Sequence, residues 1–360
     1  MYMNQDPRVC ACGKVHECAL ERLIIGRDAV LCLPSVIRDG GYGRVFLLAD
    51  TNTYAAAGRR VESLLRQADI PCAVYVFDRS PEPDEFAVGS AFMHFDPACD
   101  LVLAVGSGVI GDISKMVAHI SGADYMIVAT APSMDGFASA TSSMTRGGLK
   151  VSLPSKAARV IIGDTEILKN APMEMLVSGL GDMLAKYISI AEWRMAHVIT
   201  GEYYCEVVAT LIRDSLKKCV EHADGLLKRE EQAVEAVFEG LVYAGAAMSY
   251  AGVSRPASGV EHYFSHLWDM RGVEFGEPTS THGIQCGVAT LMAARLYEGV
   301  KKTVPDRDKG LTYAADFDRE AWFGELTDFL GTGARAMIEQ EAREGKYSTQ
   351  KHAERHFQEC

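Results

Sequence analysis

The chain has 360 residues, of which 48% are hydrophobic and 23% are charged, with 36 Lys and Arg against 48 Asp and Glu. The net charge of −12 argues against a nucleic-acid partner or an anionic-membrane surface, because both require a basic face. No apolar run approaches the roughly 20 residues of a membrane helix, and the polar N-terminus has no apolar signal-peptide core. We therefore expect a cytoplasmic protein of two domains, with no membrane insertion.

Strand and helix patterns alternate through the first half of the chain. Helical periodicity marks the segments between short apolar runs, and two further runs, LKVSLP and ARVIIGD, predict a hairpin or a sheet extension within 139–165. The alternation is typical of parallel β-α-β units and predicts a doubly wound α/β domain. The predicted strands are 43–50, 71–78, 99–108 and 124–132, and the predicted helices are 53–69, 84–95 and 111–121.

After about Asn170 the hydrophobic pattern of the sequence becomes almost continuously helical. Asn170 as N-cap and Pro172 near the first turn predict the start of a helix there. We predict an α/β domain over residues 1–168 and an all-helical domain over 169–360, with a polar tail after about residue 345.

A glycine-rich turn in LVLAVGSGVIGD carries a nucleotide-binding pattern. Gly106, Gly108 and Gly111 follow a predicted strand and precede a helix, as G-x-G-x-x-G requires. Glycines let the backbone approach a pyrophosphate, and the helix N-terminus offers free N–H groups. Asp50 ends an upstream strand and either binds a ribose 2′-hydroxyl, which would favour NAD over NADP, or caps a loop.

Small hydroxyl side chains gather after the predicted strand DYMIVATAP, in TAPSMDGFASATSS. Open α/β sheets bind ligands at the carboxyl ends of their strands, so Thr130, Ser133 and Ser139 are candidate cofactor contacts. Asp135 could face the substrate. The alternative is a Ser- and Gly-rich surface loop.

One carboxylate and two imidazoles suggest an open divalent-metal site. Asp182 lies between glycines and a helical run, His262 shares a helix face with His266, and His282 precedes a glycine and an apolar stretch. Three protein ligands leave room for water or substrate, as in catalytic sites. Each of the three could instead be a hydrogen-bonded helix residue.

The chain has 10 cysteines, most of which we interpret as reduced, buried small hydrophobes. Cys10, Cys12, His16 and Cys18 form a denser group in CACGKVHEC. Four soft ligands in so short a segment could hold zinc, although the spacing is not a standard zinc-finger pattern. A surface turn with incidental thiols is the alternative.

Six segments spread from about residue 20 to about residue 295 carry a family resemblance: LLADTNTYAAAG, AVGSGVIGDISK, TAPSMDGFAS, APMEMLVSGLGDMLAKY, SRPASGVEH and THGIQCGVA. They resemble the dehydroquinate synthase-like superfamily, which includes the iron-containing alcohol dehydrogenases, and within it the sn-glycerol-1-phosphate dehydrogenases with their bacterial AraM-type members. The resemblance implies a Rossmann-like N-terminal domain, an all-α C-terminal domain and an active site in the cleft between them. It also implies a homo-oligomer, often a dimer.

The resemblance also assigns roles to residues. Asp182, His262 and His282 would hold one divalent metal per subunit, Zn²⁺ or Ni²⁺, and Asp135 would lie near the substrate. NAD(H), with NADP(H) as a possibility, would lie along Gly106, Ser107, Gly108, Asp112, Thr130, Ser133 and Ser139.

The implied reaction is the reversible, metal- and NAD(P)H-dependent reduction of dihydroxyacetone phosphate, a small phosphorylated three-carbon ketone, to sn-glycerol 1-phosphate. His266 and Asp135 are the candidate catalytic side chains. His266 lies one helical turn after His262 and is either a proton relay or a packed helix histidine.

The substrate phosphate needs cationic or N–H donors. Arg255 in SRPASG is the first candidate, and Lys150 and Lys186 are weaker ones. Each could instead form an ordinary ion pair, and Lys186 lies four residues after Asp182, where it could pair with that carboxylate.

Three other functions stay open at this point. A dehydroquinate synthase-like cyclase or lyase would share the fold, NAD and metal, but its first metal ligand would be a Glu rather than Asp182. A glycerol or polyol dehydrogenase would lack the phosphate site. A non-catalytic NAD-binding protein would have little reason to keep a three-ligand metal set.

Overall fold

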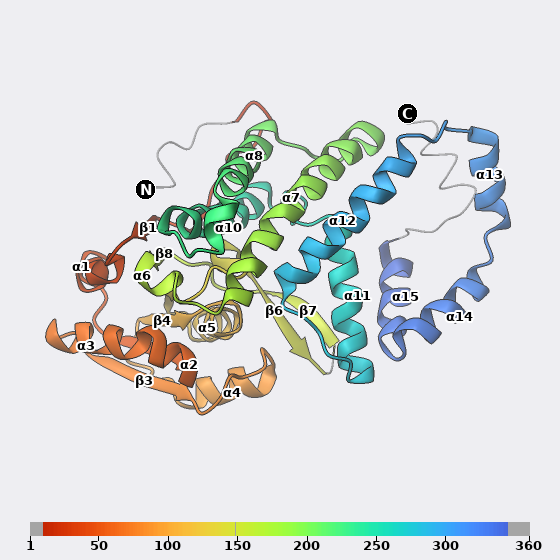
Figure 1. The fold of residues 1–360 in the computed structure, drawn as a ribbon. Helices are drawn as coiled ribbons and strands as arrows, with labels where there is room; N and C mark the ends of the chain where they lie inside the picture. The colour runs from red at the N-terminus through yellow and green to blue at the C-terminus, as the bar shows by residue number, and fades with distance from the viewer. Residues whose placement is uncertain (1–9, 148, 345–360) are drawn as a thin grey trace.

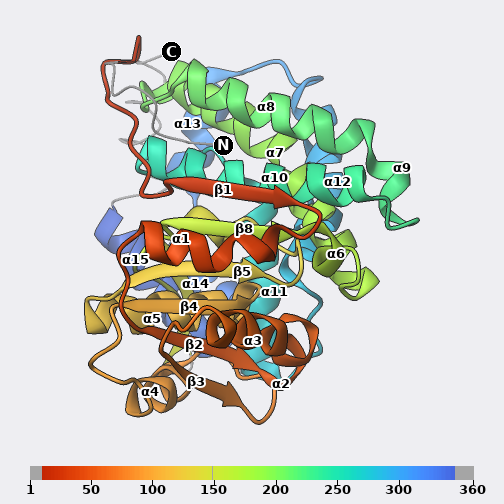
Figure 2. The same cartoon turned by 90° about the vertical axis from the view of Figure 1, so that its left-hand side faces the viewer.

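The computed structural model describes residues 10–147 and 149–344, built around a six-stranded sheet whose strand pairs are all parallel. The strand order is β1-β8-β5-β4-β2-β3, which Figure 2 shows from the sheet's edge strand β1 downward. The strands are β1 (Arg22–Gly26), β2 (Val45–Asp50), β3 (Cys72–Phe77), β4 (Leu101–Gly106), β5 (Asp124–Ala129) and β8 (Val160–Asp164). Every residue of β2, β4 and β8 is buried, as a parallel sheet covered on both faces requires.

Helices cover both faces of this sheet, so the predicted doubly wound α/β architecture is confirmed. Alternate residues of each strand point to opposite faces. Val45 and Leu47 pack with the first group of helices, and Phe46 and Leu48 pack with the second. The first group comprises α1 (Leu33–Asp39), α3 (Arg59–Gln67) and the short turns Ala29–Cys32, α2 (Thr51–Thr53) and Tyr54–Gly58; the second includes α4 (Glu85–Met93) and α5 (Gly108–Ser121).

The segment 139–165 differs in detail from the prediction. LKVSLP forms β7 (Leu149–Pro154), whose antiparallel partner is β6 (Thr141–Arg146), whereas ARVIIGD supplies β8 and inserts between β5 and β1. Strand β1 was not predicted, because RLIIG is short and borders polar residues, so its pattern does not identify a strand. Its partner β8 lies more than a hundred residues later, and no local pattern reports such a pairing.

The chain is helical from α6 onward within the described residues, as predicted (Figure 1). The predicted start of the first long helix was two residues early: Pro172, not Asn170, is the N-cap of α7. Asn170 instead donates from its side chain to the Glu166 carbonyl. The helices are α6 (Thr165–Leu168), α7 (Met173–Thr200), α8 (Glu206–Glu221), α9 (Ala223–Leu226), α10 (Glu231–Ala251), α11 (Val260–Phe275), α12 (His282–Val300), α13 (Arg307–Asp316), α14 (Arg319–Leu330) and α15 (Gly333–Glu344).

The sheet and the long helices share one large hydrophobic core. It runs from strand residues such as Phe46 and Val102 to Leu216 of α8 and Val242 of α10. A much smaller cluster around Leu330 joins the last helices to α11. Among the described residues, no helix is long and apolar enough to cross a bilayer. The domain boundary at 168/169 stays a prediction, and the polar tail after residue 345 lies outside the described residues.

Candidate metal and cofactor site

Glycines in SGLGD bring helix α7 unusually close to its neighbours. A Cβ on Gly179 would lie 1.9 Å from the Pro132 carbonyl oxygen, and one on Gly181 would lie 2.3 Å from the Gly283 carbonyl oxygen. A side chain at either position would force the backbones apart. The two glycines therefore allow α7 to meet both the loop after β5 and the start of α12, with Asp182 at the meeting point.

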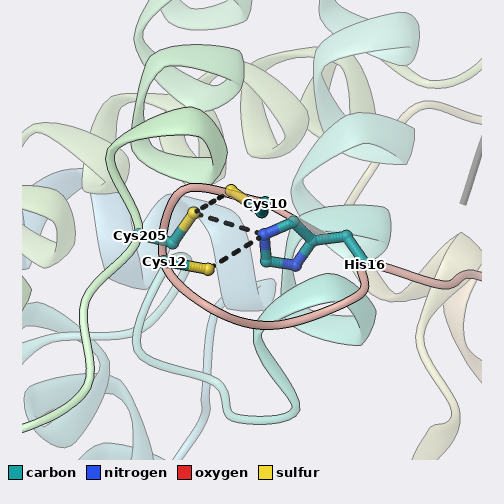
Figure 3. A group of neighbouring side chains, drawn as sticks. All are labelled: Cys10, Cys12, His16 and Cys205. Atoms are coloured by element: carbon teal, nitrogen blue, oxygen red, sulfur yellow. Dashed lines mark hydrogen bonds between the residues drawn. The ribbon is translucent and has the colours of Figure 1, made fainter. Parts of the chain in front are cut away.

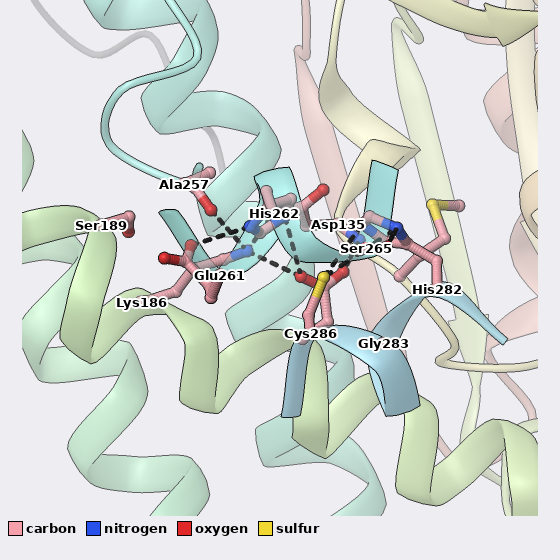
Figure 4. A network of polar contacts seen from close by, with 12 residues as sticks. Asp135, Lys186, Ser189, Ala257, Glu261, His262, Ser265, His282, Gly283 and Cys286 are labelled. Carbon is pink, nitrogen blue, oxygen red and sulfur yellow. Dashed lines mark hydrogen bonds and ion pairs between the residues drawn. The ribbon is translucent and has the colours of Figure 1, made fainter. Parts of the chain in front are cut away.

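Four donor side chains converge at this point. Asp182 from α7, His262 from α11, and His282 and Cys286 from α12 each offer one ligand atom, and these atoms all lie within 4.8 Å of one another. Figure 4 shows the two imidazoles and the Cys286 thiol facing the same small space. The three predicted metal ligands are thus brought together, and Cys286 joins them one helical turn after His282.

Both histidines present the same ring nitrogen to this space. His262 Nδ1 lies 2.8 Å from Glu261 Oε1, a carboxylate that can only accept. His282 Nδ1 lies 3.2 Å from Ser265 Oγ, whose own proton is donated to Gln285 Oε1 at 2.8 Å. With Nδ1 protonated in each ring, Nε2 is left with a lone pair, which is the usual arrangement for metal-binding histidines.

Lys186 is fully buried beside the carboxylates of this cluster. Its Nζ donates to Asp182 Oδ1 at 2.8 Å, to Asp135 Oδ2 at 2.6 Å and to the Ala257 carbonyl at 3.1 Å. Burial alone would lower the pKa of Lys186, but the carboxylates of Asp135 and Asp182 outweigh it and raise that pKa. Burial would likewise raise the pKa of Asp182, yet Lys186, followed by His282 and His262, lowers it to about 2.

This donor set fits a divalent cation. The lowered pKa of Asp182 favours its carboxylate form, and burial lowers the pKa of His282, which favours the neutral, metal-binding form of its imidazole. Burial also raises the pKa of the Cys286 thiol, so the protonated thiol is favoured there. Two imidazoles and one carboxylate are therefore the candidate ligand set, with Cys286 as an adjacent soft group.

The predicted cofactor residues lie at the switch point of the sheet. Chain connections run outward in opposite directions from β2 and β4, which are neighbours, and open α/β sheets bind dinucleotides at such a point. Asp50 ends β2, Gly106 ends β4 and Gly108 begins α5. The Asp50 carboxylate accepts from the Thr53 N–H at 2.7 Å and caps α2, so its capping role is established while ribose binding stays a prediction.

Hydroxyl groups join the glycine turn to the loop after β5. Ser107 Oγ donates to the Ala131 carbonyl at 2.9 Å and lies 2.6 Å from Ser133 Oγ. The Thr130 N–H donates to the Gly106 carbonyl at 3.0 Å. These contacts bring together the two segments that the sequence assigned to the cofactor.

The buried Lys115 of α5 holds the next part of that loop. Its Nζ donates to the Gly136 carbonyl, to Ser139 Oγ at 3.3 Å and to the Thr141 carbonyl at 3.2 Å, and lies 3.5 Å from Asp112 Oδ1. Ser139 and Asp112 are therefore part of an internal network, and their contact with a cofactor stays a prediction. The sequence analysis missed Lys115, because a lysine in a helical pattern is usually exposed.

The three phosphate candidates are already paired. Lys186 is enclosed as described, which is a correction to its candidacy for phosphate binding and confirms the alternative of pairing with Asp182. Arg255 Nε donates to Glu202 Oε1 at 2.9 Å, and Lys150 pairs with Asp269. Phosphate binding by Arg255 stays a prediction.

His266 faces solvent one turn after His262, with its ring centroid 6.4 Å from that of His262. Burial nevertheless lowers the pKa of its imidazole to about 4, so the proton relay and the packed helix histidine both stay predictions. Its place beside the donor cluster is compatible with the predicted proton relay, which no contact in the structure tests.

Comparison with known proteins shows which family the chain belongs to. The family model described as iron-containing alcohol dehydrogenase matches residues 24–172. A glycerol-1-phosphate dehydrogenase [NAD(P)+] from Halalkalibacterium halodurans is 33% identical over 304 residues, which cover 82% of this chain and 76% of that protein. The chain belongs to the glycerol-1-phosphate dehydrogenase family. A member from the archaeon Methanosarcina acetivorans is 32% identical over 79% of this chain and 78% of its own length.

Solved structures agree on the fold of this glycerol-1-phosphate dehydrogenase family member. A glycerol dehydrogenase from Schizosaccharomyces pombe superposes with a TM-score of 0.64 at 16% identity, covering 88% of this chain and 86% of that one. An iron-containing alcohol dehydrogenase from Thermococcus thioreducens gives 0.63 at 17% identity, over 91% and 85% of the two chains. The predicted dehydroquinate synthase-like fold is confirmed.

Three residues beside the site were missed by sequence reasoning: Glu261, Ser265 and Cys286. Glu261 directly precedes His262, and a carboxylate next to a ligand in sequence normally points elsewhere on a helix. Here Glu261 lies in the first turn of α11, where Oε1 also accepts from the Gly259 N–H at 2.8 Å and so turns back toward the imidazole. The His-x3-Cys spacing of His282 and Cys286 is a signal that could have been used.

Proposed function

We propose that this protein catalyses the reversible, metal- and NAD(P)H-dependent reduction of dihydroxyacetone phosphate to sn-glycerol 1-phosphate. The observation that carries the proposal is the convergence of Asp182, His262 and His282 beside the loop after β5, which is itself hydrogen-bonded to the glycine turn. This arrangement supports a cation site next to the proposed nucleotide site, and the similarity to glycerol-1-phosphate dehydrogenases supports the choice of substrate.

A bound divalent cation, which we propose is Zn²⁺ or Ni²⁺, would supply Lewis-acid polarisation of the ketone oxygen. NAD(P)H would supply the hydride. The chain's own residues hold these groups in place. Asp182 and the Nε2 atoms of both histidines provide donors, and Glu261 and Ser265 fix the orientation of the rings.

Asp135 is the protein side chain that we assign to the substrate. Its backbone N–H donates to Asp182 Oδ2 at 2.9 Å, and its carboxylate is fixed by Lys186, so it borders the donor cluster. A carboxylate held there can accept a hydrogen bond from a substrate hydroxyl. We assign His266, which is exposed and close to His262, to proton exchange with solvent.

The test is NADH oxidation by purified protein with dihydroxyacetone phosphate, before and after chelation and add-back of single metals. Turnover that disappears with chelator and returns with one cation supports the proposal, and chiral analysis of the product establishes its stereochemistry. Equal turnover with unphosphorylated dihydroxyacetone would indicate a polyol dehydrogenase instead. Conversion of a cyclase substrate without net NADH consumption would indicate the dehydroquinate synthase type.

A further inference from the structure

A second cluster of soft donors lies at the N-terminal segment, apart from the site described above. Cys10, Cys12 and His16 meet Cys205, and the four candidate ligand atoms all lie within 4.8 Å of one another. Figure 3 shows the three sulfur atoms gathered on one side of the His16 ring. Cys205 is the N-cap residue of α8, so the cluster joins two parts of the chain that are far apart in sequence.

Three of the six distances between these atoms agree with the edges of a tetrahedral zinc site. Cys10 Sγ lies 3.7 Å from Cys205 Sγ, and His16 Nε2 lies 3.5 Å from Cys12 Sγ and 3.3 Å from Cys205 Sγ. In tetrahedral zinc sites with Zn–S of about 2.3 Å and Zn–N of about 2.05 Å, the sulfurs lie about 3.8 Å apart and sulfur and nitrogen about 3.6 Å apart. The side chains are therefore already at ligand spacing.

The tautomer of His16 is also the one that a metal needs. His16 Nδ1 lies 2.9 Å from the Tyr250 carbonyl oxygen, which can only accept, so Nδ1 carries the proton. The lone pair of Nε2 then faces the sulfurs. A second ring nitrogen bonded to a backbone carbonyl is the common way in which proteins orient a metal-binding histidine.

The surroundings suit a cluster of thiolates. The Tyr203 hydroxyl oxygen lies 3.4 Å from Cys12 Sγ and can donate to a thiolate there. The Lys14 Nζ lies 3.5 Å from the centre of the Tyr203 ring, which adds a positive charge nearby. Three thiolates would otherwise repel one another, and a divalent cation is the simplest group that would neutralise them.

The fourth member differs from the sequence-based expectation. The sequence grouped Cys18 with the other three, but Cys18 is not among the four residues whose ligand atoms converge. Cys205 takes its place. No sequence spacing could have identified Cys205, because the contact depends on how the N-terminal segment lies across the helices.

We propose that Cys10, Cys12, His16 and Cys205 bind one structural Zn²⁺. Four protein ligands complete a tetrahedral shell and leave no position for substrate, unlike the three-ligand site at Asp182. The ion would fasten the segment before β1 to the start of α8, across the helical part of the molecule. Its role would be to hold the N-terminal segment in place rather than to take part in the reaction.

Zinc content per subunit, measured by elemental analysis on protein loaded with Zn²⁺ alone, tests the proposal. Wild type should carry one zinc more than Cys12→Ser or Cys205→Ser. Asp182→Ala should lose a different ion, so combining it with Cys205→Ser should remove both. Cys18→Ser is the matched control, since Cys18 lies in the same segment outside the cluster, and it should keep the wild-type zinc content.

A measurement on wild type guards against variants that fail to fold. Replacing Zn²⁺ by Co²⁺ should produce a thiolate-to-cobalt charge-transfer band in the near ultraviolet. This band should persist in Cys286→Ser, which removes the thiol of the other site. Unchanged zinc content in Cys205→Ser, absence of the cobalt band in wild type, or a Cys10–Cys205 disulfide in non-reduced peptide maps would each overturn the proposal.

Discussion

The backbone N–H of Asp135 donates to Asp182 Oδ2 at 2.9 Å, and this hydrogen bond joins the loop after the central strand β5 to helix α7, which carries the first candidate metal ligand. Lys186 reinforces the tie by donating to both carboxylates. The position of Asp182 relative to the cofactor edge of the sheet is therefore set by direct bonds rather than by distant packing. Substitutions of Asp182 should therefore change metal binding and NADH binding to different extents, and the two can be measured separately.

Asp182→Ala should lower turnover by about three orders of magnitude while leaving NADH affinity nearly unchanged. The change removes one of three cation donors, and the loss of several kcal/mol of Lewis-acid stabilisation corresponds to about a 10³-fold fall in kcat. NADH binding is measured by fluorescence titration and metal content by elemental analysis. Asp182→Asn, which keeps the shape of the side chain, is the companion variant. Wild-type activity in Asp182→Ala would show that the metal assignment is wrong.

Gly181→Ala should weaken both metal binding and stability. The added methyl group would lie 2.3 Å from the Gly283 carbonyl oxygen, so α7 and α12 must separate and carry Asp182 away from His282. We expect a destabilisation of about 1–3 kcal/mol, as for other overpacked sites, seen as a lower thermal midpoint. Gly299→Ala, in the same α12 but with open space around its Cβ, is the control and should be neutral or slightly stabilising. Equal thermal midpoints in the two variants would mean that Gly181 is not required for the close contact between α7 and α12.

Glu261→Gln should lower metal affinity without unfolding the protein. Glu261 Oε1 accepts from His262 Nδ1, and an amide in its place would be a weaker acceptor for the imidazole N–H. Loss of such a supporting carboxylate costs about 10–100-fold in metal affinity. Competition with a chelator of known affinity measures the change. The exposed Glu174→Gln controls for the charge, and an identical metal affinity in both variants would count against an orienting role for Glu261.

Asp124 should make stability depend on pH. Its carboxylate accepts from the Tyr42 hydroxyl at 2.9 Å and pairs with Arg159 at 2.6 Å and Lys156 at 3.2 Å. Partial burial would raise the pKa of Asp124, but the hydrogen bonds from Arg159, Tyr42 and Lys156 outweigh it and lower that pKa. A lowered folded-state pKa contributes stability above the unfolded value of about 3.9, and this contribution is lost as the pH falls through the folded-state pKa.

The comparison of wild type with Asp124→Asn measures this contribution. The thermal midpoint of the variant should lie below that of wild type at neutral pH, and the gap should narrow as the pH is lowered through about 4. A gap that stays constant over this range would mean that Asp124 acts through packing rather than through its charge.

Most of the architecture could be predicted from local patterns, because buried parallel strands and long helices each have a strong period. The exceptions are pairings made across the chain. Strand β1 joins β8, and the hairpin β6–β7 uses a strand, TSSMTR, whose polar residues conceal it. Such pairings depend on the fold as a whole.

In the candidate site, too, some features could be predicted from the sequence and others could not. Asp182, His262 and His282 could be proposed from residue type and context, and the structure brings them together. The spacing allowed a pair between Lys186 and Asp182, but the second contact of Lys186 with Asp135 and the ion pair of Arg255 with Glu202 could not be proposed, since their partners lie far away in the sequence. The candidate ligands could therefore be predicted from the sequence, whereas the charge partners of the basic side chains could be identified only from the structure.

The glycine contacts between α7 and α12 also bear on the order in which the molecule is assembled. The donors of the candidate three-ligand site come from three helices, and two of these, α7 with Asp182 and α12 with His282, meet backbone to backbone at Gly181 and Gly283. An unfolded chain offers a cation only isolated ligands, whereas the folded chain offers all three, so bound metal stabilises the native state by mass action. We therefore expect metal uptake to follow folding rather than to initiate it.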